Sequence, residues 1–113
     1  VMGQEVGTFT PGILSTQVRL IEEESNEFFQ AYAQAIVFVQ NIRAREACLK
    51  ELADLVYVAF QFAAAAGWEL DEALDRVHQS NMSKLVDGKP LKRADGKVLK
   101  GPNYEPPYLT DLV

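Results

Sequence analysis

The sequence predicts an all-α fold, and three features of the first 84 residues indicate it. Apolar side chains recur at helical spacing from about residue 15, an apolar run spans Leu55 to Ala66, and Gly67 follows that run. The chain has 113 residues, 48% of them hydrophobic, which suits one compact domain. We expect a helical core over residues 15–84, a lead-in over 1–14 and an irregular tail over 85–113.

The first expected helix follows a lead-in that contains three glycines and Pro11. Ser15 or Thr16 can cap its start, and the signal for its end, near Gln40 and Asn41, is poor. The positions that recur at helical spacing, and that we expect to face the core, are Val18, Ile21, Ser25, Phe28, Tyr32 and Ala35.

The second expected helix runs from about Arg45 to Ala66 and stops at Gly67, which tolerates a left-handed helix cap. Its apolar run, "LVYVAFQFAAAA", is too short to cross a bilayer and predicts a buried helix. A helix that is apolar nearly all the way round needs cover on every side, which a chain of this size can hardly supply. We therefore expect a homo-oligomer and no membrane partner.

A third helix is expected from a cap at Asp71 to about Lys84. Two Asp-Gly turns follow it, and the second can close a short hairpin of residues 91–93 with residues 98–100. The last residues, "GPNYEPPYLTDLV", are expected to be extended.

Charge is divided unevenly along the chain, whose net charge is −5. Residues 1–75 carry four basic against twelve acidic side chains, whereas residues 76–113 carry seven against four. This pattern fits a protein that holds cations with one half and anions with the other, although solvation of separate faces also produces it. The acidic total disfavours a nucleic acid polymer as partner. A single cysteine and the lack of a leader-like start favour the cytoplasm.

Two pairs of acidic residues form the clearest candidate site. Glu24 and Glu27 lie three residues apart, as do Glu51 and Asp54, and each pair continues an otherwise apolar line of a predicted helix. If the two lines face each other across antiparallel helices, four carboxylates converge and need a counter-charge. Oxygen ligands alone suit Mg²⁺ or Mn²⁺. The alternative is a solvated acidic face.

Other chemistries have weaker support in the sequence. A di-iron bundle uses two Glu-x-x-His pairs, whereas this chain offers one imperfect match, Asp75 with His78. Glycine-rich nucleotide motifs are absent, so a phosphate site must be built from metal and side chains. The stretch from Lys84 to Lys100 has six basic residues in seventeen, which could hold the outer phosphates of a triphosphate or form a charged tail.

The motif "EEESNE" ends at Glu27, and after 23 intervening residues comes "ELAD"; together they resemble the signature of the MazG-like, all-α nucleoside triphosphate pyrophosphohydrolases. The segments "DEALDRVHQSNMSKL" and "DGKVLKGPNYEPP" resemble the phage and bacterial branch that is akin to phosphoribosyl-ATP pyrophosphohydrolase. The likeness covers roughly residues 13 to 108.

The resemblance implies a helical core related to a four-helix bundle, assembled as a dimer or tetramer. By matched position it implies Mg²⁺ or Mn²⁺ ligands at Glu24, Glu27, Glu51 and Asp54. It implies a catalytic role for Glu24 and for Glu23, the latter as a further ligand or as the group that orients the attacking water. Asn81 and Lys84 would contact nucleotide, and the residues that would close over the phosphates are Lys97, Lys100 and Tyr104.

The family reaction splits a nucleoside triphosphate between its α and β phosphorus atoms and releases a monophosphate and pyrophosphate. Metal ions and a carboxylate near a bound water suit that chemistry. Among substrates the resemblance favours dGTP or GTP, in the cytoplasm of a bacterium or of a virus-infected bacterial host. Two alternatives remain open: hydrolysis of phosphoribosyl-ATP, and a non-catalytic acidic helical assembly module.

Overall fold

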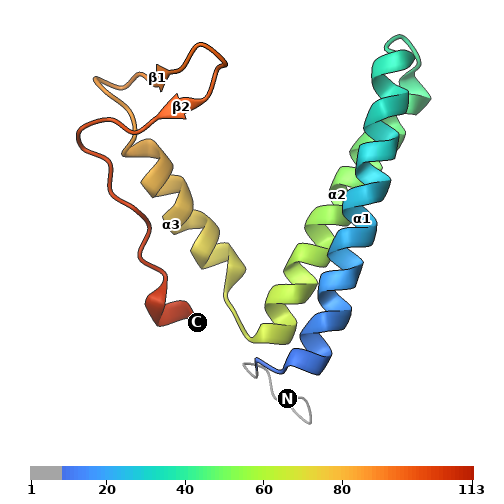
Figure 1. Ribbon diagram of the computed structural model, residues 1–113, viewed down its shortest axis with the longest axis horizontal. Coiled ribbons are helices and arrows are strands. Elements are labelled where there is room, and N and C mark those ends of the chain that lie inside the picture. Colours follow the sequence, from blue (N-terminus) through green and yellow to red (C-terminus); the bar gives the residue numbers. More distant parts are fainter. Residues whose placement is uncertain (1–8) are drawn as a thin grey trace. The chain divides into compact units, whose positions relative to one another are not determined.

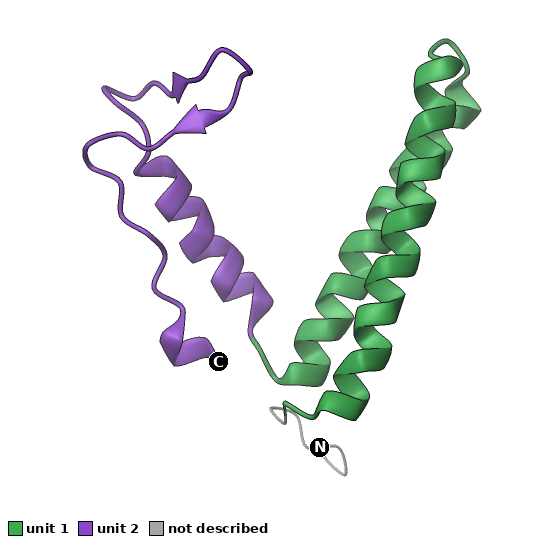
Figure 2. Cartoon of the chain, viewed as in Figure 1, with its two compact units in different colours: residues 1–68 green, residues 69–113 purple. Residues whose placement is uncertain are grey.

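The computed structural model describes residues 9–113, and it divides into two compact units. The first ends at Trp68 and the second runs from Glu69 to Val113, as Figure 2 shows. The core is all-α, as the sequence predicts, with three helices and a small two-stranded sheet in the described part of the chain. The glycines Gly3 and Gly7 of the expected lead-in lie outside the described residues.

The first unit is a hairpin of two long helices, α1 (Pro11–Val37) and α2 (Ile42–Ala66), which lie side by side in Figure 1. The predicted start of α1 at Ser15 or Thr16 was wrong, because the helix already begins at Pro11 after Thr10. Proline is favoured at the first helical position because its φ is already close to the helical value. It loses nothing by lacking an N–H there, since the N–H at this position has no partner within a helix. Ser15 instead donates a hydrogen bond to the carbonyl of Gly12, inside the helix.

Helix α2 begins three residues earlier than predicted, because Asn41 caps it. The Asn41 Oδ1 accepts hydrogen bonds from the backbone N–H groups of Arg43, at 2.9 Å, and Ala44, at 3.4 Å. At the other end the helix stops at Ala66, and Gly67 has the predicted left-handed conformation, with φ of 77°. The prediction for the end of this helix is confirmed.

Packing between α1 and α2 buries few side chains. The buried apolar residues of the described chain are Leu14, Val58, Ala63 and Ala66. Trp68 packs beside them, with its ring centroid 5.6 Å from that of Phe9 and 5.7 Å from that of Phe62. Many large apolar side chains of the two helices stay exposed, including Phe29, Ile36, Leu49, Tyr57 and Phe60. Apolar surface of both helices is therefore not buried by other residues of the first unit.

The second unit begins with α3 (Leu70–Met82). The predicted cap at Asp71 was wrong: α3 starts one residue before it, and Asp71 lies in the first turn, where a carboxylate stabilises the positive end of the helix dipole. The predicted hairpin is confirmed, as β1 (Leu91–Lys92) pairs antiparallel with β2 (Val98–Leu99). A short 3₁₀ helix, η1 (Thr110–Leu112), interrupts the extended C-terminal segment.

In the part of the chain that the structure describes, no helix is both long and apolar enough to span a membrane.

Gly101 ties the end of the hairpin to the end of α3. Its N–H donates a hydrogen bond of 3.1 Å to the carbonyl oxygen of Lys84. A Cβ atom at this position would lie 2.7 Å from that same oxygen and 2.8 Å from the Val86 Cγ2 atom. The close approach of two backbone segments explains why this position requires glycine.

We predict that Gly101→Ala loosens the second unit, because a backbone oxygen cannot move aside as a flexible side chain can. Overpacking of this kind costs about 1–3 kcal/mol. Hydrogen exchange at the amides of residues 84–86 and 101 should become faster. Gly12→Ala is the matched control, because a Cβ there would meet no atom within 4 Å. Equal exchange in Gly101→Ala and the wild type would contradict the steric explanation.

Candidate functional site

Three of the four predicted carboxylates meet across the helical hairpin. Glu24 comes from α1, whereas Glu51 and Asp54 come from successive turns of α2. Each offers one oxygen atom, and these atoms lie within 4.8 Å of one another. A spacing of three residues keeps Glu51 and Asp54 on one face of α2, and antiparallel pairing of the helices brings Glu24 to that face. We call these three residues the carboxylate cluster.

The carboxylate cluster contains oxygen atoms that nothing satisfies. Glu24 Oε2 and Glu51 Oε1 are both buried, and neither has a hydrogen-bond partner within the described chain. Burial raises the pKa of Glu24, and so do the adjacent carboxyl of Glu27 and the negative charges of Asp54 and Glu51. Both features show that the negative charge of the carboxylate cluster is poorly compensated within the described chain.

Lys50 supplies part of that charge, and the sequence reading did not single it out. Its Nζ atom lies 2.7 Å from Asp54 Oδ2 and 3.5 Å from Glu51 Oε2. The hydrogen bond to Asp54, and the charges of the two carboxylates, raise the pKa of Lys50. Its side chain is 67% exposed, so the pair is screened by water and contributes little to stability. The spacing of four residues between Lys50 and Asp54 was the available signal.

Glu27 adjoins the carboxylate cluster, whereas Glu23 has no recorded contact with it in the described chain. Glu27 neighbours Glu24 and is exposed, and together with Glu51 it lines a surface cavity of about 450 Å³. Glu23 is also exposed, and it lines another cavity of α1 with Arg19 and Asn26. Glu27 therefore borders the cluster directly, whereas Glu23 projects from a neighbouring face of the helix.

The donor set of the carboxylate cluster fits a hard divalent cation. All of its ligand atoms are carboxylate oxygens, which Mg²⁺ and Mn²⁺ prefer over nitrogen or sulfur. A divalent ion would also provide the partner that the orphaned oxygens of Glu24 and Glu51 lack. Asp75 and His78, the imperfect di-iron match, are exposed residues of α3 and do not belong to the cluster.

A second group of predicted residues gathers in the other unit, where Lys84, Lys100 and Tyr104 form a basic cluster. The Nζ atom of Lys100 lies 4.8 Å from the ring centroid of Tyr104, and that of Lys84 lies 5.9 Å from it. Both distances are within the range of a cation–π contact. Two ammonium groups held over one ring present a concentrated positive charge to an anion.

The side chains of the other two predicted residues of this unit, Asn81 and Lys97, have no recorded contact with the basic cluster in the described chain. Asn81 is exposed at the end of α3, and its carbonyl accepts a hydrogen bond from the N–H of Lys84. Lys97 is exposed in the hairpin turn, where its N–H donates to Asp95 Oδ1 at 3.1 Å.

The shortest ion pair recorded in the described part of this unit joins residues far apart in sequence. Arg76 of α3 contacts Asp111 at 2.6 Å, and no local pattern could have predicted a pair separated by 35 residues. Ser80 and Ser83 make hydrogen bonds at the end of α3.

Comparison with known proteins agrees with this geometry. The family model for phosphoribosyl-ATP pyrophosphohydrolase matches residues 3–81, which contain all three residues of the carboxylate cluster. A search of curated proteins finds no match to the chain. Because the family match covers well over half of the sequence, the chain belongs to the phosphoribosyl-ATP pyrophosphohydrolase family of MazG-like, all-α enzymes, which indicates nucleotide pyrophosphohydrolase activity.

Proposed function

We propose that the protein hydrolyses nucleoside triphosphates, of the ribo or deoxyribo series, to the monophosphate and pyrophosphate. The observation that carries the proposal is the carboxylate cluster, whose oxygens lie within 4.8 Å of one another inside the family match. Among substrates we favour the purines dGTP and GTP, because the phage and bacterial proteins that the sequence resembles include enzymes of that kind.

Glu24, Glu51 and Asp54 would hold the divalent ion, with Glu27 at the border of the cluster as a fourth ligand. A bound Mg²⁺ or Mn²⁺ neutralises phosphate charge and lowers the pKa of a bound water. Glu23 would accept or orient the proton of that water, together with Glu24. Lys50 would compete with the ion for the carboxylate of Asp54, which it contacts in the metal-free protein.

The basic cluster would bind the outer phosphates. Lys84 and Lys100 supply the charge, and the hydroxyl of Tyr104 can add a hydrogen bond. Asn81 would contact the nucleotide, and Lys97 would close over the phosphates from the hairpin turn. Charge stabilisation by positioned cations is the main contribution of a protein to phosphoryl chemistry, because the reaction needs no side-chain nucleophile.

A second candidate substrate is phosphoribosyl-ATP. The name of the matching family favours it, and the bond that breaks is the same phosphoanhydride. Activity on that compound, with none on free triphosphates, would select this candidate.

We also propose that residues 1–113 act as one pyrophosphohydrolase domain in a homodimer or homotetramer. Exposed apolar residues along both long helices, among them Phe29, Leu49 and Phe60, support self-association. Two hairpins packed on each other would complete a four-helix bundle. We expect the enzyme to act on free nucleotides in the cytoplasm of a bacterium or virus-infected host, without a nucleic acid polymer as partner.

The double variant Glu51→Gln with Asp54→Asn should lose turnover, because two ligands of the carboxylate cluster lose their charge. Wild-type protein, incubated with a panel of nucleotides and Mg²⁺ or Mn²⁺, should release monophosphate and pyrophosphate, as resolved by chromatography. We expect the double variant to lose at least a hundredfold in rate while its helical circular dichroism spectrum persists. Release of diphosphate and orthophosphate by the wild type would contradict the proposed reaction.

The Glu24→Gln variant should stabilise the metal-free protein near neutral pH. Folding raises the pKa of Glu24 above its ordinary value of 4.5, so its ionisation opposes folding as pH rises through the folded-state pKa. Urea denaturation with chelator should give a higher midpoint for the variant at about pH 7 and equal midpoints at about pH 4. Added Mg²⁺ should raise the urea midpoint of the wild type and should not raise that of Glu24→Gln.

The matched control for Glu24→Gln is Glu22→Gln, which removes an exposed charge of the same helix. Its midpoint should stay close to that of the wild type. If Glu22→Gln and Glu24→Gln shift the midpoint equally, the loss of one negative charge explains the effect. That result would contradict an explanation by repulsion within the carboxylate cluster.

The Lys100→Ala variant should raise KM for the triphosphate by about tenfold with little change in kcat, as expected for a charged contact to phosphate. Lys92→Ala is the control, because Lys92 is exposed on β1 and lies outside the basic cluster. Steady-state kinetics at saturating Mg²⁺ measure both. An equal rise in KM for the two variants would indicate nonspecific attraction by the basic tail.

A further inference from the structure

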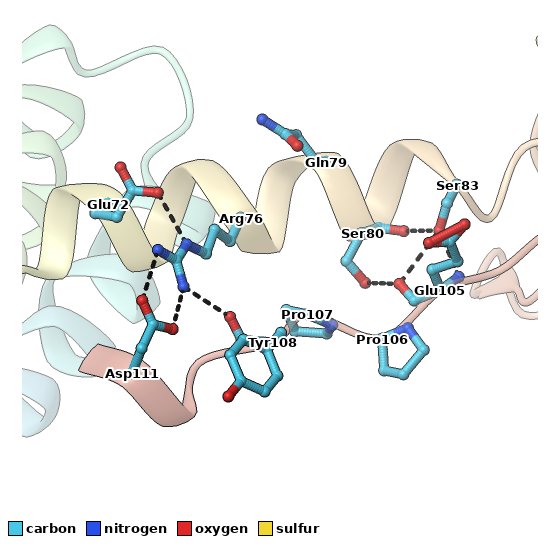
Figure 3. Close-up of a pocket in the computed structure, with 10 residues that line it drawn as sticks. All are labelled: Glu72, Arg76, Gln79, Ser80, Ser83, Glu105, Pro106, Pro107, Tyr108 and Asp111. Atoms are coloured by element: carbon cyan, nitrogen blue, oxygen red, sulfur yellow. Dashed lines mark hydrogen bonds and ion pairs between the residues drawn. The ribbon is translucent and has the colours of Figure 1, made fainter. Parts of the chain in front are cut away.

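The C-terminal segment is tied along one face of α3. We call residues 105–111 the C-terminal strap. Arg76, Ser80 and Ser83 lie four and three residues apart, which puts their side chains on one face of the helix end. All three bond to the strap, as the close-up in Figure 3 shows. The strap therefore has three attachment points along α3.

Arg76 forms the attachment at the far end of the strap. Its Nη1 and Nη2 atoms donate to the two carboxylate oxygens of Asp111 at 2.6 and 3.0 Å, a bidentate fork. Nη1 also donates to the Tyr108 carbonyl at 3.0 Å, and Nε donates to Glu72 at 2.8 Å. The guanidinium holds the pKa of Asp111 below its usual range. All three guanidinium nitrogens of Arg76 thus donate hydrogen bonds within the second unit.

Ser80 and Ser83 form the attachment at the near end, at Glu105. The buried Ser80 Oγ donates to the Glu105 carbonyl at 2.7 Å, and Ser83 Oγ accepts from the Glu105 N–H at 2.8 Å. Between the two ends come Pro106 and Pro107, which have no N–H to satisfy and a fixed φ. Prolines reduce the freedom that the strap loses when it docks.

The near end of the strap adjoins the basic cluster. Glu105 follows Tyr104 directly, and Tyr104 carries Lys100 over its ring. Lys84 reaches the same ring from the end of α3, and Gly101 is tied to the Lys84 carbonyl. Docking at Glu105 therefore fixes the chain on one side of Tyr104, and the Gly101 contact fixes it on the other.

We propose that Arg76 and Asp111 form a latch that positions the basic cluster. The latch holds the strap in place, the strap holds Tyr104, and Tyr104 aligns Lys100 with Lys84. Arg76 and Asp111 are positioning residues, since the cavity of about 710 Å³ that they line is bordered by groups that already bond one another. The inference rests on the proposed phosphate-binding role of Lys84, Lys100 and Tyr104.

The test compares Asp111→Asn with Asp75→Asn in the full chain. Asp75 is the matched control, because it is an exposed acid on α3 that bonds Gln79 and not the strap. Three quantities are measured: hydrogen exchange of residues 97–105, the kinetic constants for the triphosphate, and Mg²⁺ affinity without nucleotide. Asp111→Glu, which keeps the charge, is the rescue variant, and Arg76→Lys is the milder variant if Asp111→Asn loses helicity.

We expect Asp111→Asn to speed exchange of residues 97–105 and to raise KM about fivefold, a fraction of the effect of losing a phosphate contact. The kcat and the Mg²⁺ affinity should stay unchanged, Asp75→Asn should behave as wild type, and Asp111→Glu should recover both exchange and KM. Hydrogen exchange in Asp111→Asn equal to that of the wild type would overturn the latch. Faster exchange with an unchanged KM would also overturn it, because docking of the strap would then not affect the basic cluster.

The proposed reaction can fail separately from the latch. If the wild type hydrolyses no triphosphate, the affinity for inorganic tripolyphosphate replaces KM as the readout. Weaker tripolyphosphate binding by Asp111→Asn, with faster exchange, would then still support the latch, whereas equal binding would overturn it.

Discussion

The convergence of carboxylates across the α1/α2 hairpin is the constraint on which the first unit depends. Glu24, Glu51 and Asp54 are partly buried and repel one another; burial, the adjacent carboxyl of Glu27 and this repulsion raise the pKa of Glu24. A protein that only needed stability would gain by replacing such a group with apolar residues. Lys50 relieves part of the repulsion from an exposed position, but two buried oxygens of the cluster have no hydrogen-bond partner among residues 9–113. These features support the proposed cation site at the carboxylate cluster.

The second unit is held together mainly by polar contacts, in contrast to the helical hairpin. Among the described residues of this unit, Ser80 is the one that is buried. The C-terminal strap is held to α3 by hydrogen bonds and by the bidentate ion pair of Arg76 with Asp111. Such contacts are directional, so they fix the position of a segment more sharply than they stabilise it. This property suits the proposed role of the neighbouring residues Lys100 and Tyr104 in binding phosphate.

The sequence predicted those features that depend on residues close together in the chain. Helical spacing of carboxylates placed Glu24 opposite Glu51 and Asp54, Gly67 marked the end of α2, and the second Asp-Gly turn located the hairpin. The start of α1 was missed because Pro11 was assigned to the lead-in over residues 1–14 rather than to the first helical position. The contact between Arg76 and Asp111 could not be predicted, because it depends on the path of 34 intervening residues.

Binding of Mn²⁺ to the metal-free protein, followed by electron paramagnetic resonance without nucleotide, tests the role of the carboxylate cluster most directly. The signal of free Mn²⁺ should fall as protein is added and should return when excess Mg²⁺ competes for the same oxygens. The measurement is independent of substrate, oligomer and basic cluster. A free Mn²⁺ signal that stays equal to that of buffer up to millimolar protein would contradict a cation site at Glu24, Glu51 and Asp54.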